Sequence, residues 1–92
     1  MDRVRVLIAS PLEAELVERI RDAEPRAEVV FEPDLLPPAR YPGDHRGDPE
    51  FRRDPAGEAR WRELLDQAEV LFGIPDDSAA GLAAVAGLPR LR

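Results

Sequence analysis

VRVLIA at residues 4–9 is an almost unbroken apolar run, and two similar runs follow it, AEVVF at residues 27–31 and EVLFG at residues 69–73. Each is short, mainly apolar and followed by a helix-like segment. Strands that alternate with helices predict a parallel sheet and an α/β fold. Such sheets carry their ligand sites in loops at the carboxyl ends of the strands. We therefore expect function at residues 10–12, 32–54 or 73–77.

The first helix is expected to begin directly after the first run. Ser10 can act as its N-cap, Pro11 suits its first position, and Glu13 can reach back to complete a capping box. The apolar spacing carries this helix to about Ala23, and Pro25 prevents its continuation.

Two further helices follow from similar signals. Asp54 and Pro55 form a cap and a first helical residue, and we expect this second helix to reach about residue 68. Its apolar residues fall at a helical spacing that predicts a buried stripe, namely Trp61, Leu64, Leu65 and Ala68. A third helix, capped by Asp77 or Ser78, is expected to carry Leu82 and Val85 inward.

The stretch from residue 32 to residue 54 contains many prolines, which exclude a helix or a central strand over most of its length. A loop this long within a small domain is uncommon and is usually functional or disordered. Its bulky apolar residues predict at least partial docking onto the body of the domain, and they are Leu35, Leu36, Tyr41 and Phe51.

Composition excludes several classes of protein. The chain has 92 residues, no Cys and a net charge of -6, and all 13 of its basic residues are Arg. Without Cys it has no disulfide framework and no thiolate zinc site. The acidic balance disfavours nucleic acid as a partner. No apolar run is long enough for a signal peptide or a membrane span, so we expect no membrane partner and a cytoplasmic location.

Few side chains are candidates for chemistry. His45, the only His, is a possible acid–base group, but a solvated loop residue is the more economical interpretation. The pair Asp76 and Asp77 is better explained as helix capping than as a cation site. The expected helix starts near Glu13 and near Asp77 could bind an anion through their amides. The sequence favours no metal site.

The whole segment resembles the N-terminal part of the D-isomer-specific 2-hydroxyacid dehydrogenases. The resemblance is carried by VRVLIASPL at residues 4–12, VVFEPDLLP at residues 29–37, YPGDHRGD at residues 41–48 and EVLFGIP at residues 69–75. It implies a flavodoxin-like, three-layer parallel sheet, of which this βαβαβα chain would be one part. Residues 1–92 would be an incomplete N-terminal portion of the substrate-binding (catalytic) domain.

The same resemblance implies an oxidoreductase that passes hydride between NAD(H) or NADP(H) and a small 2-hydroxy or 2-keto acid, with a homodimer as the full-length form. Substrate-binding residues carried over from the family are Gly73, Ile74 and Pro75. The family's catalytic Arg, Glu and His have no counterpart in this chain, and G-x-G-x-x-G is absent. We therefore expect no catalytic, cofactor-binding or metal-binding residue here, and no activity of the segment alone.

Two alternatives remain at the level of sequence. One is a non-enzymatic flavodoxin-like binding module, such as a phospho-receiver. It is disfavoured because receivers need an acidic pair after the first strand, where this chain has Ala9 and Ser10. The other, part of a sugar-transferring enzyme, has no positive motif. The chain ends where a fourth strand would begin, which predicts an exposed sheet edge and a natural sequence that continues.

Overall fold

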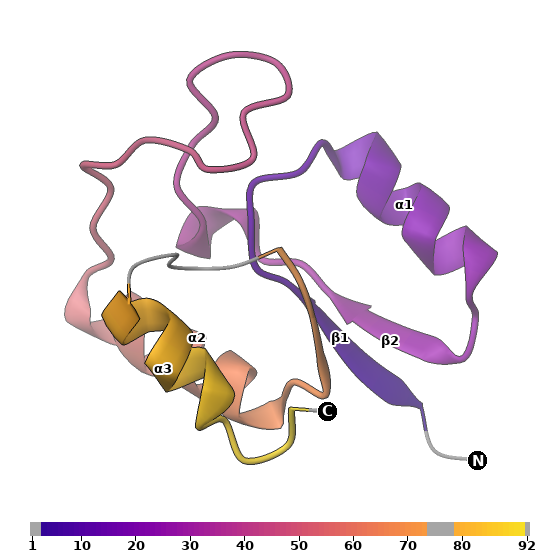
Figure 1. The fold of residues 1–92 in the computed structure, drawn as a ribbon. Helices are drawn as coiled ribbons and strands as arrows, with labels where there is room; N and C mark the ends of the chain where they lie inside the picture. Colours follow the sequence, from indigo (N-terminus) through magenta and orange to yellow (C-terminus); the bar gives the residue numbers. More distant parts are fainter. Residues whose placement is uncertain (1–2, 74–78, 92) are drawn as a thin grey trace.

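The computed structural model describes residues 3–73 and 79–91 (Figure 1). In chain order the elements are β1 (Val4–Ile8), α1 (Ala14–Ala23), β2 (Ala27–Val30), the short 3-10 helix η1 (Pro33–Leu35), α2 (Pro55–Gln67), β3 (Val70–Phe72) and α3 (Ala79–Ala86). The three expected strands and the three expected helices are therefore all present, and the α/β class predicted from the alternation is confirmed.

The three strands form one parallel sheet in the order β2-β1-β3. Val6 pairs with Val29 on one side and with Val70 on the other. One further backbone bond continues the β1–β3 contact beyond the strands, because the Ala9 amide donates to the Phe72 carbonyl at 2.8 Å. β1 is thus the central strand, and its carboxyl end lies directly beside the carboxyl end of β3.

Successive residues of β1 serve two separate cores because side chains of a strand alternate between its faces. Leu7 and Ala9 belong to a cluster with Trp61 and other residues of the α2 side. Ile8 belongs to a second cluster with Val17 of α1 and Val29 of β2. Figure 1 accordingly shows α1 separated from α2 and α3 by the sheet. This two-sided burial is the reason for the unbroken apolar run.

The predicted helical stripe of α2 is confirmed. Trp61, Leu64 and Ala68 are 6%, 4% and 0% exposed, and Leu65 is half-buried. The predicted cap is also present, since Asp54 Oδ1 accepts a hydrogen bond from the Gly57 amide at 2.7 Å. Pro55 occupies the first turn, as expected from its fixed φ.

The predicted start of α1 was wrong. The helix begins at Ala14, with Glu13 at the N-cap position and no side-chain cap. Residues 11–13 instead continue without regular structure from the end of β1, and this path brings Leu12 against the Ile8 cluster. Ser10 is not a cap because it is buried against the end of β3, and the Glu13 carboxylate accepts from Gly43 rather than reaching back.

Two expected burials were also wrong. Leu82 is 46% exposed and Tyr41 is 58% exposed. α3 turns a different face to the body, since Gly81 is buried and Val85 is half-buried. Both residues line the hollow that α3 shares with α2. The expected caps of α3 at Asp77 or Ser78 lie outside the described residues.

Candidate functional site

The carboxyl ends of β1 and β3 meet at Ser10 and Gly73. Gly73 has φ +90°, a left-handed conformation that residues with a Cβ seldom adopt. A Cβ added there would lie 1.7 Å from Ser10 Oγ and 2.7 Å from Ser10 Cβ. Ser10 itself is only 9% exposed, whereas Gly73 is exposed. Glycine is therefore required at the end of β3 for two reasons, its backbone conformation and its contact with Ser10.

This geometry bears on one of the three substrate-binding residues expected from the sequence. Gly73 makes a close backbone approach to Ser10 of the same chain, and its expected part in substrate binding stays a prediction. Ile74 and Pro75 lie outside the described residues, as do Asp76 and Asp77. Gly73 lies at the carboxyl-end edge of the sheet, the edge at which parallel sheets carry ligand sites.

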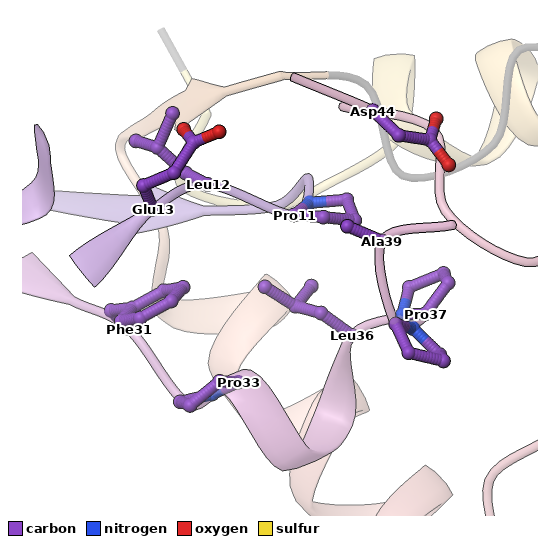
Figure 2. A pocket seen from close by; sticks show the side chains of 10 residues that line it. Pro11, Leu12, Glu13, Phe31, Pro33, Leu36, Pro37, Ala39 and Asp44 are labelled. Carbon is purple, nitrogen blue, oxygen red and sulfur yellow. The ribbon is translucent and has the colours of Figure 1, made fainter. Parts of the chain in front are cut away.

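A hollow of about 200 Å³ opens at the same edge, beyond the ends of β1 and β2 (Figure 2). Its walls come from three segments: the connection after β1, the end of β2, and the proline-rich loop. They are mainly apolar, and the principal residues are Pro11, Leu12, Phe31, Pro33, Leu36 and Pro37. Leu36 is 4% exposed and also belongs to the α2-side core. The docking that the sequence predicted for this loop residue is therefore confirmed.

Asp44 organises the loop on one side of this hollow. Its carboxylate accepts from Arg40 Nε at 2.8 Å and from the backbone amides of Arg40, Arg46 and Gly47 at 3.1–3.2 Å. The Arg40 guanidinium, helped by these amides, holds the pKa of Asp44 well below its usual range. Asp44 is 4% exposed, so the turn is built around a buried and fully engaged carboxylate.

Gly47 closes this turn against the start of the loop. It has φ +78°, and an added Cβ would lie 2.4 Å from Pro37 Cβ. The Asp48 amide also donates to the Pro38 carbonyl at 3.0 Å. The loop between residues 37 and 48 is therefore a compact, self-bonded structure.

Glu13 ties this loop to the start of α1. One carboxylate oxygen accepts from the Gly43 amide at 3.2 Å, and the other lies 3.8 Å from His45 Nε2. Hydrogen bonds from its own amide and from Gly43, together with the nearby His45, lower the pKa of Glu13. His45 is more than half exposed. It contacts an acid on the surface, as the solvated interpretation predicts.

The carboxylates determine which groups this hollow would accept. In Figure 2 Glu13 and Asp44 lie on the side of Pro11 and Leu12, across the hollow from Pro33. Arg40 neutralises the Asp44 carboxylate, so Glu13 supplies the acidic rim. With this rim and apolar walls, the hollow suits an apolar group and disfavours a carboxylate. The helix start at which an anion site was expected lies at Ala14, with Glu13 at the N-cap position and no side-chain cap, and anion binding there stays a prediction. The second expected anion site, near Asp77, lies outside the described residues.

Sequence reasoning missed two features of this edge. Asp44 was not singled out, although an Asp three residues before a Gly is a recognisable turn signal. The contact between Ser10 and Gly73 has no local signal, since it depends on the β1–β3 register. Among the described residues, no group of three or more His, Asp or Glu is arranged to hold a metal ion.

Comparison of the chain with protein-family models, with curated proteins and with solved structures found no match in any of the three. Within the described ranges, no helix combines the length and apolar character needed to cross a membrane.

Proposed function

We propose that this chain is the N-terminal part of the substrate domain of an NAD(P)-dependent D-2-hydroxyacid dehydrogenase. The observation that carries the proposal is the sequence pattern at all three strand ends, combined with a glycine at the end of β3 that permits close approach of the backbone. The strand order β2-β1-β3 supports it further, because this is the order in which a flavodoxin-like sheet begins.

In this proposal Gly73 lies at the wall of the substrate cleft, and the connection after β3 contributes to substrate binding through Ile74 and Pro75. Pro75 has no backbone N–H to donate, so its part is packing. The hollow beside Phe31 and Leu36 is a poor receptor for the substrate carboxylate, since the Glu13 carboxylate lines it. The substrate acid therefore approaches from the β3 side of the edge.

The cofactor and the catalytic groups come from sequence other than these 92 residues. Residues 1–92 contain no G-x-G-x-x-G, and their only His, His45, lies 3.8 Å from Glu13 on the long loop and is not a counterpart of the family's catalytic His. The proposed full-length enzyme binds NAD(H) or NADP(H), acts on a 2-hydroxy or 2-keto acid, and is a cytoplasmic homodimer.

The test is turnover by the product of the complete reading frame. Oxidation of NADH or NADPH is followed by absorbance while a panel of short 2-keto acids is supplied. We expect turnover with at least one acid, and no turnover and no micromolar NADH binding by residues 1–92 alone. Failure of the complete product with every acid and both cofactors refutes the proposal, as does tight NADH binding by the isolated chain.

The receiver-type alternative is weaker. A phospho-accepting or metal-binding acid pair would have to stand at the end of β1, where the structure has the buried Ala9 and Ser10. Labelling of residues 1–92 by acetyl phosphate would favour that alternative.

A further inference from the structure

A second hollow lies between α2 and α3, away from the strand ends. Its volume is about 240 Å³, below the roughly 300–1,000 Å³ of pockets for drug-sized ligands. Its floor is apolar and is formed by Trp61 and Leu65 of α2 with Val85 and Leu88 from the α3 side. A space of this size and lining suits the apolar body of a small ligand.

Arg53 is a preorganised cation at this groove. Its guanidinium lies over the Trp61 ring at 4.4 Å and near the Phe51 ring at 5.4 Å from the centroids. Its Nε donates to the Leu35 carbonyl at 2.7 Å, and its side chain is only 17% exposed. A guanidinium held by two rings and a carbonyl loses little side-chain entropy when it meets an anion.

Arg62 supplies a second positive charge. It is exposed and forms no ion pair with another described residue, although Glu58 lies one helical turn before it. Glu58 contacts Arg53 instead, at 3.5 Å. The lining thus holds two guanidinium groups and one carboxylate, which leaves the groove positive on a chain whose net charge is -6.

We propose that the α2–α3 groove binds a small organic carboxylate with an apolar body. The body rests on Trp61 and the apolar floor, and the carboxylate lies between Arg62 and Arg53. Apolar walls with a few convergent polar groups are the usual composition of small-molecule sites. This site is distinct from the strand-end edge, and it does not rest on the dehydrogenase assignment.

The chain offers a direct reporter, because Trp61 is its only Trp. Benzoate is the probe, benzamide its neutral counterpart and benzylamine its cationic one. Each is titrated into residues 1–92 while the single indole N–H signal is followed by NMR. We expect benzoate to shift this signal with half-saturation at about 0.1–1 mM, in keeping with a small ligand. Benzamide should bind at least about fivefold more weakly and benzylamine should have no effect.

Two variants separate charge from shape. Arg62→Gln should weaken benzoate about fivefold, the size of one solvent-exposed charge contact, and leave benzamide unchanged. Ala84→Leu should weaken both probes about tenfold, because it fills the groove with a side chain that a helix accepts readily. The matched control is Arg52→Gln, since Arg52 bonds only to backbone carbonyls outside the groove.

Equal binding of benzoate and benzamide, or equal benzoate affinity in wild type and Arg62→Gln, overturns the proposal. So does the absence of any indole shift with benzoate at about 20 mM, well above the expected half-saturation. If Arg62→Gln or Ala84→Leu fails to fold, the other variant still tests the proposal, because the two substitutions act on different parts of the groove.

Discussion

Gly73→Ala is the substitution that probes the strand-end junction most sharply. It should destabilise the domain for two separable reasons. A residue with a Cβ in the left-handed region costs about 1–2 kcal/mol, and Gly73 has φ +90°. The new Cβ would also overlap Ser10 Oγ at 1.7 Å, and such overpacking costs about 1–3 kcal/mol. Together they lower the free energy of unfolding by about 2–5 kcal/mol, a large share of what a small domain has.

Gly43→Ala is the matched control. Gly43 has φ +80°, but nothing lies within 4 Å of its added Cβ. This variant should lose only the conformational part, about 1–2 kcal/mol. The difference between the two variants isolates the overlap with Ser10.

The assay is urea unfolding followed by Trp61 fluorescence, with the unfolding free energy obtained by linear extrapolation. Adding Ser10→Gly to Gly73→Ala removes both overlapping atoms and leaves the Ser10 backbone nitrogen, 3.3 Å from the new Cβ, as the nearest contact. The pair should therefore recover about 1–3 kcal/mol in a double-mutant cycle. If Gly73→Ala and Gly43→Ala lose equal unfolding free energy, and Gly73→Ala shows no coupling to Ser10→Gly, the close contact between Gly73 and Ser10 is refuted.

Further predictions concern the long loop. Asp44→Asn should speed tryptic cleavage after Arg46, because Asp44 accepts from the Arg46 and Gly47 amides and from Arg40; cleavage at the wild-type rate would contradict this. Since the pKa of folded Asp44 is lowered, its stabilising effect is present above the unfolded value of about 3.9 and is lost as pH falls through the folded one. The difference in unfolding free energy between wild type and Asp44→Asn should be constant from about pH 8 to 5 and narrow below about pH 4. A difference that widens in acid would show that the pKa of Asp44 is not lowered by folding. Leu36→Ala should cost about 2–4 kcal/mol in urea unfolding because Leu36 is 4% exposed. Tyr41→Ala, at an exposed site, should stay within about 0.5 kcal/mol, and similar losses for both would argue against docking through Leu36.

Much of the fold could be predicted because it is encoded by local patterns. The apolar run of β1 and the stripe from Trp61 to Ala68 each reflect burial within a single element, and Asp54 marks the start of α2 by a short-range hydrogen bond. The start of α1 was misjudged for the opposite reason. Ser10 and Glu13 have the chemistry of a capping box, but contacts with Gly73 and Gly43, distant in sequence, determine what they do.

The same distinction applies to the candidate site. Gly73 was expected at the site from the family resemblance, and its place at the end of β3 follows from the local strand pattern. The role of Asp44 depends on a loop that folds back on itself, and the acidic rim depends on Glu13 meeting that loop. Leu82 was placed inward by helical spacing alone, yet α3 approaches α2 through Gly81 and Val85, and spacing does not reveal which side a helix presents.

The configuration of the product tests the proposed function most directly. The complete reading-frame product is supplied with a 2-keto acid and NADH or NADPH, and the 2-hydroxy acid formed is resolved by chiral chromatography. The assignment to the D-isomer-specific dehydrogenases predicts that the D enantiomer accumulates as the reduced cofactor is consumed. Formation of the L enantiomer, or no 2-hydroxy acid at all, would contradict it.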